Sequence, residues 1–439
     1  MNQSNIHKKI VVLGAGIAGV TTAIGLKRLG FDDVTIIYKN RAFTAYEGFS
    51  EKTKDGFKMM HCINAYNSLK TKSMRNSNWA NISKSVNYEY VICRDDLDKA
   101  LLKDAKEFDI KLVNASVTGE INLEDKPKVN YKLNNTIEEI STDFIVDCRG
   151  RFTPYKNDYK EGPKSFSILQ ELEIPKQGEN KTSIDSIKNG WVWQAYVGEN
   201  KAYLQFTCDE ETAKKIKSFD VVLKHLENQN LELWSLKKYK TKNNIVKRDS
   251  YSKVHKTIVT DKMILVGDSA SSIDPLSGNG AFQTMSMSSI APYVVNTILN
   301  KKENKQTAID FYKKRVNYIF EKFSNVGKEF YEMETRFDSE FWKARQTWPK
   351  GVKIESQNIK IEQGAIVKED YIEPKEVLIT QDNPLGIYFL GDIEIVQLVK
   401  YCLENNKEKS INYFKKYTED LNENFVYMLN LWLQKYKLL

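Results

Sequence analysis

Two glycine-rich stretches carry the residue types and spacing that most directly indicate chemistry. Residues 11–19 read VVLGAGIAG, so an apolar strand meets a helix through Gly14, Ala15, Gly16 and Gly19. This arrangement lets backbone N–H groups and the positive end of the helix dipole bind a pyrophosphate. Residues 263–280 read MILVGDSASSIDPLSGNG, which repeats a strand, a turn at Gly267 and a glycine-rich helix start, with Asp268 in the turn.

The second stretch adds groups that suit a flavin ring. Backbone N–H groups at the helix start can point toward the flavin N1 and C2 carbonyl, where negative charge gathers on reduction. The residues concerned are Ser277, Gly278, Asn279 and Gly280. The alternative for them is a simple helix cap. The two stretches, in this order, predict that the chain binds FAD.

Two arginines are candidates for contacts with the cofactor. In many dinucleotide folds an acid ends the second strand and binds the adenosine ribose, but here Tyr38 stands at that position. Arg41, just after it, either helps to clamp the adenosine diphosphate or is a solvated loop charge. Arg94 ends another predicted strand, where it either contacts flavin phosphate or ribityl oxygens or forms a salt bridge with Asp95 or Asp98.

Aromatic and acidic side chains are candidates for substrate contacts. Trp191 and Trp193 alternate along one predicted strand and therefore share a face, where they either wall an active cavity or fill the core. Glu47 ends an apolar turn by the expected flavin edge. We expect it to accept a proton or to orient an indole N–H, the alternative being a solvated acid.

The elements that must position these residues indicate an α/β fold. Residues 10–14, 20–29 and 34–38 form a strand-helix-strand unit, and residues 144–147 add a strand to its sheet. We predict a discontinuous, Rossmann-like FAD-binding domain of the glutathione-reductase type at residues 1–50, 87–155 and 255–300. Alternating apolar segments predict an inserted antiparallel substrate domain at residues 51–86 and 156–254. Residues 301–439 are predicted to form a C-terminal helical cap.

Composition narrows the class of protein. The chain has 439 residues, of which 41% are hydrophobic, and 66 Lys and Arg against 58 Asp and Glu give a net charge of +8. The positive charges are dispersed, which argues against nucleic-acid binding. Five cysteines without a C-x-x-C pair argue against disulfides and a metal site. With no export signal and no apolar stretch long enough to span a bilayer, we expect a cytoplasmic protein.

These pieces in this order resemble the flavin monooxygenase superfamily of the aromatic-hydroxylase type, which also contains the flavin-dependent tryptophan halogenases. The resemblance covers about residues 8–300 and implies that Asp268 binds the ribityl hydroxyls. It also implies that Pro275, with Gly278 to Gly280, flanks the isoalloxazine. The implied activity is hydroxylation of an aromatic substrate through a flavin C4a-hydroperoxide. Molecular oxygen would be consumed, and electrons would come from NAD(P)H or a separate flavin reductase.

A closer similarity lies in the segments YEGFSE (46–51), GWVW (190–193), FYEMETRF (330–337) and FWKARQTWP (341–349). This combination resembles flavoproteins that oxygenate a peptide-bound tryptophan while maturing a tryptophylquinone cofactor. It implies a substrate that is an aromatic small molecule or a peptide- or protein-bound ring. It also draws attention to a cluster that either receives a protein substrate or forms ordinary salt bridges between helices, namely Tyr331, Glu332, Arg336, Trp342 and Arg345.

Two other activities use the same scaffold. The halogenase branch shares the Trp191-x-Trp193 element, but its version continues into Ile-Pro where this chain has Ala195 and Tyr196. A halogenase also needs a lysine between flavin and substrate, for which Lys70 and Lys72 are the candidates. Flavin-dependent reductases of isoprenoid double bonds share the two glycine motifs and would turn over without oxygen. The remaining alternative is a protein without enzymatic activity, in which the flavin is structural and the chain holds a partner.

Overall fold

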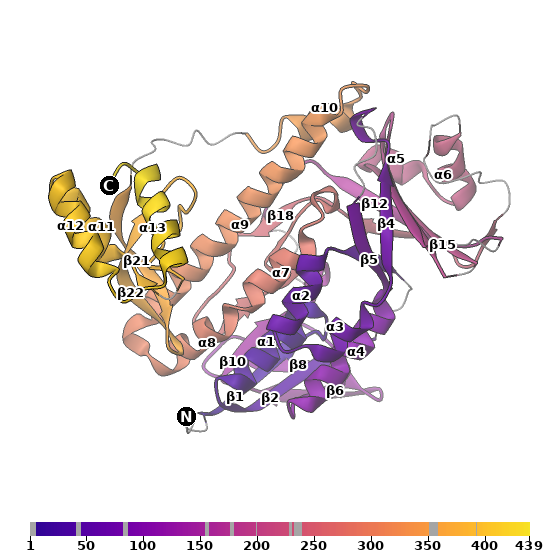
Figure 1. Ribbon diagram of the computed structural model, residues 1–439. Helices are drawn as coiled ribbons and strands as arrows, with labels where there is room; N and C mark the ends of the chain where they lie inside the picture. Colours follow the sequence, from indigo (N-terminus) through magenta and orange to yellow (C-terminus); the bar gives the residue numbers. More distant parts are fainter. Residues whose placement is uncertain are drawn as a thin grey trace. The chain divides into compact units, whose positions relative to one another are not determined.

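The computed structural model describes residues 6–40, 45–81, 87–153, 158–175, 180–198, 200–227, 231, 239–350, 359–391 and 393–439. These residues form a mixed α/β fold with one parallel sheet and several further sheets (Figure 1). The prediction of an α/β fold is therefore confirmed.

A five-stranded parallel sheet carries both glycine stretches. Its strand order is β19 (Met263–Leu265), β10 (Phe144–Asp147), β1 (Ile6–Leu13), β2 (Phe31–Tyr38) and β6 (Lys111–Asn114). Residues 10–13 of β1 are fully buried, as expected for a central strand covered on both faces. Helix α1 (Ile17–Arg28) connects β1 to β2. Because parallel strands end at a common edge, the turns after β1, β10 and β19 lie together.

A second, larger sheet has nine strands, all antiparallel to their neighbours except for the parallel pair β13 and β4. The main path runs through β16 (Lys240–Thr241), β12 (Ser165–Glu173), β15 (Lys201–Asp209), β14 (Gly190–Val197), β13 (Lys181–Ile187), β4 (Lys72–Ser77), β5 (Asn87–Cys93) and β3 (Tyr46–Phe49). Strand β17 (Val246–Asp249) pairs with β12 beside this path.

Strands β3 and β5 depart from the predicted domain boundaries. The sequence predicts that residues 46–50 and 87–93 belong to the cofactor domain, but both strands join the larger sheet, where β5 pairs with β3 and β4. Position in the chain does not identify a strand's partner, because pairing depends on which edge the strand reaches. The larger sheet therefore positions Glu47 on β3 and Arg94 just after β5.

The larger sheet is covered on both faces. Val192, Leu204 and Phe206 point to the face on which α5 (Glu210–Lys215) and α6 (Phe219–Leu226) pack. Trp191, Trp193 and Tyr203 point to the opposite face, together with aromatic residues from beyond position 330. We call this second face the tryptophan face.

The remaining elements of this part of the chain connect or cover the two sheets. The helices are α2 (Glu51–Met59), α3 (Ile63–Ser68), α4 (Arg94–Glu107), α7 (Gly280–Ser288), α8 (Ala291–Asn300), α9 (Lys305–Met333) and α10 (Glu340–Gln346). Two small sheets comprise β7 (Ser116–Val117), β8 (Lys128–Leu133) and β9 (Thr136–Ser141), and β11 (Tyr159–Glu161), β18 (Lys253–His255) and β20 (Ser271–Ser272).

The C-terminal region is not the purely helical cap that the sequence predicts. The chain divides into two compact units, Met1–Val295 with Val316–Gly351, and Asn296–Arg315 with Val352–Leu439. The second unit contains an antiparallel hairpin of β21 (Lys360–Lys368) and β22 (Tyr371–Ile379), which turns at Glu369 with φ +52°. Charged residues stand among the β-branched residues of both strands. The sequence of this hairpin therefore looks like that of a charged, solvent-exposed helix.

Helices and a short strand pair complete the second unit. They are β23 (Phe389–Leu390), β24 (Ile393–Glu394), α11 (Val396–Glu404), α12 (Lys407–Tyr417) and α13 (Glu423–Lys435). Apolar residues of these helices and of β22 form the unit's core. None of the helices that the structure describes combines the length and apolar character needed to cross a membrane.

Candidate active site

The first glycine turn is so tightly packed that two of its glycines leave no room for a side chain. Gly14 has φ +101°, and a Cβ there would lie 2.6 Å from the Cys148 carbonyl oxygen. A Cβ on Gly19 would lie 1.9 Å from the Gly14 carbonyl oxygen. These glycines let β1 and α1 pack against the residue that follows β10.

Gly16 has a different role in the same turn. It is the N-cap of α1 and has no side chain to accept a hydrogen bond from the first helical turn. A Cβ on Gly16 would lie 3.6 Å from Arg94 Nη2. Gly16 and the half-buried Ala15 therefore present bare backbone beside a cation, which suits a phosphate.

Arg94 is held at this position by two carboxylates. Its Nη1 lies 3.0 Å from Glu47 Oε2 and its Nη2 lies 3.1 Å from Asp98 Oδ1. Burial lowers the pKa of Arg94, but Glu47 and Asp98 outweigh it and raise the pKa above its usual value. Arg94 is thus a permanent charge beside Gly16. Of the predicted salt bridges, the one with Asp98 is present, and Glu47 is engaged with Arg94 instead of being free.

The second glycine turn contacts the first. Gly267 has φ +70°, and a Cβ there would lie 2.9 Å from the Cβ of Ala18 on α1. The neighbouring Ser269 Oγ accepts a hydrogen bond from the Gly150 N–H at 2.8 Å. Asp268 has 42% of its side chain exposed and pairs with Arg151 across 3.4 Å. The two stretches, more than 240 residues apart in the chain, therefore form one continuous edge.

The segment from Asp274 to Gly280 continues this edge and is open. The Asp274 carboxylate accepts a hydrogen bond from the Leu276 N–H at 3.0 Å and so begins the turn Pro275–Ser277. Gly278 follows with φ +63°, and a Cβ on Gly278 or Gly280 would meet no atom of the described residues within 4 Å. Ser277 and Asn279 hold the turn through side-chain contacts with its own carbonyls. Pro275 and Gly278 are both exposed just before the start of α7.

These features fit FAD. Gly16 and the start of α1, with Arg94, would hold the diphosphate, and the half-exposed carboxylate of Asp268 would accept hydrogen bonds from hydroxyls. The bare backbone at Gly278 and Gly280 would leave space for a planar ring. Each of these positions combines open space with backbone N–H groups or charge, as a cofactor cradle requires.

Trp191 and Trp193 share the tryptophan face, as predicted, and both are buried. Trp191 Nε1 donates a hydrogen bond to the Tyr331 hydroxyl at 3.1 Å, and Trp193 Nε1 donates to Glu89 Oε1 at 3.2 Å. The Tyr331 hydroxyl donates in turn to Asp274, whose oxygens lie at 3.1 and 3.2 Å. Trp191, at 2% exposed, fills the core and connects it to the second turn.

Burial keeps the Tyr331 hydroxyl protonated opposite Asp274. Burial raises the pKa of the Tyr331 hydroxyl well above its usual value, so it stays protonated and can donate. Burial also raises the pKa of Asp274, while Arg345, the Leu276 N–H and Tyr331 oppose that shift. A donor therefore always faces the acid that begins the second turn.

The cluster predicted to receive a substrate is mostly packed inside the protein. Tyr331, Trp342 and Arg345 are 2%, 0% and 4% exposed, and the Arg345 guanidinium lies 3.8 Å from the centre of the Phe341 ring. Glu332 is exposed and pairs with Lys328. Among these residues the structure favours the alternative of internal packing and ion pairs.

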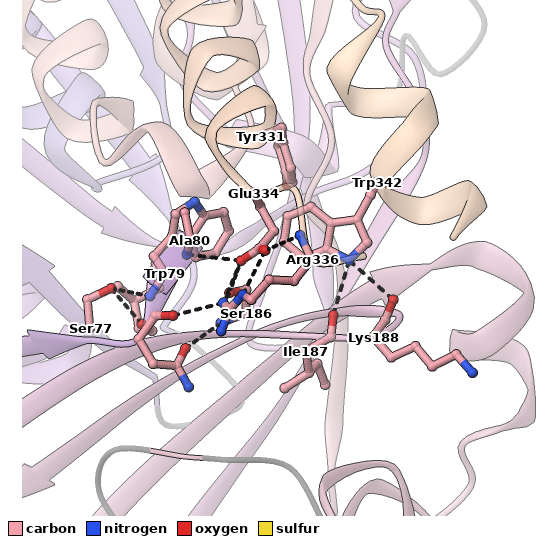
Figure 2. A network of polar contacts seen from close by, with 12 residues as sticks. Ser77, Trp79, Ala80, Ser186, Ile187, Lys188, Tyr331, Glu334, Arg336 and Trp342 are labelled. Atoms are coloured by element: carbon pink, nitrogen blue, oxygen red, sulfur yellow. Dashed lines mark hydrogen bonds and ion pairs between the residues drawn. The ribbon is translucent and has the colours of Figure 1, made fainter. Parts of the chain in front are cut away.

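Glu334, which the sequence analysis did not single out, organises the end of α9 (Figure 2). Its carboxylate accepts hydrogen bonds from the Ala80 N–H, the Ser186 hydroxyl and the Arg336 guanidinium. Burial raises the pKa of Glu334, but these hydrogen bonds outweigh it and lower the pKa to about 2. The network fastens α9 to β13 and so positions Tyr331, three residues earlier.

Several predicted residues lie elsewhere. Arg41 is outside the described residues. Lys70 is exposed, and Lys72 pairs with Glu51 at 2.9 Å. Lys72 also lies opposite Tyr90 on β5, and Tyr90 alternates with Val91 of the tryptophan face. Lys72 therefore points to the other face of the sheet. In the part of the chain that the structure describes, no group of three His, Cys, Asp or Glu side chains could hold a metal ion.

Glu89 is the acid on the tryptophan face that the sequence analysis missed. It is 6% exposed. It lies two residues before Val91 on β5, so its side chain is on the same face as that of Val91, the tryptophan face. The signal available in the sequence was an acid between two tyrosines in a strand, which ordinarily indicates a solvent-facing position. Only its pairing in the larger sheet turns it inward.

Comparison with known proteins agrees with this geometry. The chain matches the family model described as tryptophan halogenase over residues 46–373. A tryptophan 2-halogenase from Chondromyces crocatus is 24% identical over 370 residues, which is 77% of this chain and 70% of that protein.

Two solved structures match nearly the whole chain. The peptidyl tryptophan dihydroxylase QhpG, described as essential for tryptophylquinone cofactor biogenesis, is 27% identical, with 99% of this chain and 100% of that chain covered and a TM-score of 0.82. CmlS, a flavin-dependent halogenase, is 15% identical, with 99% and 96% covered and a TM-score of 0.76. At this level of identity, the similarity to CmlS shows a shared fold.

The family match covers more than half of the chain and includes the second glycine turn, the tryptophan face and α9. The enzyme is a flavin-dependent oxidoreductase whose cofactor is FAD. The chain therefore belongs to the tryptophan halogenase family.

Proposed function

We propose that the chain is an FAD-dependent monooxygenase that hydroxylates an aromatic ring, namely a tryptophan side chain carried by a peptide or protein. The observation that carries this proposal is the match to a peptidyl tryptophan dihydroxylase along the full length of both chains. When bound and reduced, FAD supplies the electrons that activate molecular oxygen. Those electrons come from NAD(P)H or from a separate flavin reductase.

The chain's own residues supply binding, orientation and exclusion of water. Arg94 and the start of α1 hold the diphosphate, Asp268 holds the ribityl hydroxyls, and the N–H groups near Gly280 face the ring. Pro275 flanks the ring from the exposed side of the turn. Trp193, with the buried cluster around it, excludes water from the adjacent part of the tryptophan face.

Glu47 has a supporting task in this proposal. Its carboxylate fixes the Arg94 guanidinium at 3.0 Å, and its side chain is 35% exposed at the edge of the site. Glu47 therefore orients the cation that binds the phosphate, and it does not orient the substrate.

Halogenation is the second candidate, because the matched family and the curated relative are named for it. The placement of Lys72 removes one of the two lysines, Lys70 and Lys72, that could serve this activity. Lys72 points away from the tryptophan face and pairs with Glu51, so it cannot carry a halogen from flavin to a substrate beside Trp193.

A product-mass experiment tests the proposal. The protein, loaded with FAD and supplied with NADH and a flavin reductase, is incubated with a tryptophan-containing peptide under ¹⁸O₂ in chloride and bromide. We expect the peptide to gain labelled oxygen and no halogen. The Asp268→Ala variant, which should bind FAD weakly, is the control. A halogenated product, or turnover in the absence of oxygen, would overturn the proposal.

A further inference from the structure

The Glu89 carboxylate is buried with fewer hydrogen bonds than it can accept. An ionised carboxylate has about four acceptor positions, and leaving them empty inside a protein is costly. Among the described residues, Oε1 accepts one hydrogen bond, from Trp193 Nε1 at 3.2 Å. Oε2 faces Arg75 Nη1 at 4.0 Å, the outer limit of an ion pair. The side chain is nevertheless only 8% exposed.

The surroundings of Oε2 are the Gly48 backbone, against which it packs, and the Arg75 side chain. A Cβ on Gly48 would lie 2.0 Å from Oε2, so the carboxylate lies directly against a residue without a side chain. Gly48 is exposed, and Arg75 on the neighbouring strand has 33% of its side chain exposed. The carboxylate is therefore shielded by Trp193 on one side and bordered by bare backbone on the other.

This carboxylate also lies on the face of the larger sheet that reaches the second glycine turn. Val91, two residues along the same strand, belongs to the cluster that contains Trp193 and Leu276 of the second glycine turn. Glu89 therefore lies on the face that reaches the expected flavin edge. Its existing partner is an indole N–H, the kind of donor that an indole substrate would present.

We propose that Glu89 binds the ring N–H of the substrate, which makes the substrate an N–H heteroaromatic ring such as indole. The inference rests on the proposed function for the presence of an aromatic substrate. It adds the group that recognises that ring. Glu89 also takes the role of orienting an indole that the sequence analysis gave to Glu47, which is held by Arg94.

The test compares two ligands on FAD-loaded protein. N-acetyltryptophanamide and its 1-methylindole analogue differ at the ring nitrogen, and their binding is measured from the change in flavin absorbance. We expect wild type to prefer the N–H ligand by about 10-fold or more, as a hydrogen bond to a charged group implies. In Glu89→Gln the preference should fall to within about 2-fold, since the neutral amide is a weaker acceptor.

A matched control is Glu171→Gln. Glu171 is equally buried on the same face of the larger sheet, but Lys242 pairs with it at 3.1 Å. This variant should keep the wild-type preference and FAD content. If Glu89→Gln fails to fold, Glu89→Asp retains the charge, retracts the carboxylate and should reduce the preference as well.

The outcomes separate the two proposals. A Glu89→Gln protein that keeps the wild-type preference, or a wild type that shows none or binds neither ligand, overturns the role of Glu89. A wild type that prefers the N–H ligand but never oxygenates a peptide supports Glu89 and overturns the proposed function.

Discussion

At the first glycine turn, a Cβ on Gly19 would lie 1.9 Å from a carbonyl oxygen, whereas at the second a Cβ on Gly278 or Gly280 would meet no atom within 4 Å in the part of the chain that the structure describes. The same residue type therefore serves two purposes. At Gly14 and Gly19, neighbouring backbone fills the space that a side chain would need. At Gly278 and Gly280, that space is open. A glycine of the first kind supports the fold, while one of the second kind is expected to serve a ligand.

The two turns also differ in how they are held. The first depends on backbone contacts among β1, α1 and Cys148. The second is supported from outside, because Asp274 accepts a hydrogen bond from Tyr331 on α9, whose end is fastened by Glu334. Substitutions at the glycines of the first turn and at the residues that support the second turn should therefore have different effects on stability and on FAD binding.

The largest effect is expected for Gly19→Ala. The added methyl group must displace backbone at the β1–α1 junction, so the free energy of unfolding of the FAD-free protein should fall by about 3 kcal/mol. Urea denaturation followed by circular dichroism measures this change. Unchanged stability would show that the first turn is not packed as described.

Acid should weaken the outside support of the second turn. The pKa of Glu334 is lowered from 4.5 to about 2 in the folded protein, so its stabilisation is complete above pH 4.5 and is lost as the pH falls toward 2. Between pH 6 and 3 this residue should account for a loss of about 2 kcal/mol. Glu334→Gln should show a correspondingly smaller decline in denaturant titrations. An equal decline in both proteins would contradict this assignment.

Tyr331→Phe tests the link between α9 and the second turn. The variant keeps the ring but removes the donor to Asp274, which should cost about 1 kcal/mol of stability. It should also weaken FAD binding several-fold, as measured by titration of the FAD-free protein. Tyr203→Phe, which removes a buried hydroxyl from the same cluster, is the control and should leave FAD affinity unchanged.

The smallest effect on stability is expected for Gly280→Ala. A methyl group meets open space at the first residue of α7, so the unfolding free energy should change by less than about 0.5 kcal/mol. FAD affinity should nevertheless fall about 10-fold if the ring occupies that space. An unchanged affinity would remove the distinction between the two turns.

Local signals in the sequence predicted the parallel sheet well. Residues 10–13 are continuously apolar and are followed by glycines with fixed spacing, so both the strand and the turn could be recognised. The presence of Trp191 and Trp193 on one face follows from the alternation of side chains along a strand. The hairpin at residues 360–379 was missed because its charged residues conceal the β-branched ones.

The partners of individual charges were less predictable. Glu47 and Glu89 both lie on strands of the larger sheet, yet one binds Arg94 and the other lies beneath Trp193. Which face each carboxylate occupies depends on strand register, and a shift of one residue would reverse it. Glu334 was overlooked for a related reason, since its partners Ala80 and Ser186 are more than 140 residues away.

The sequence by itself determined the two strand-turn units and predicted that they bind a phosphate-containing cofactor, because glycine spacing and apolar runs are local properties. Only the tertiary structure decided which glycines are packed and which are open, and which acids meet which cations. Those properties arise from contacts between segments distant in the chain, and no local pattern encodes the distance between two such segments.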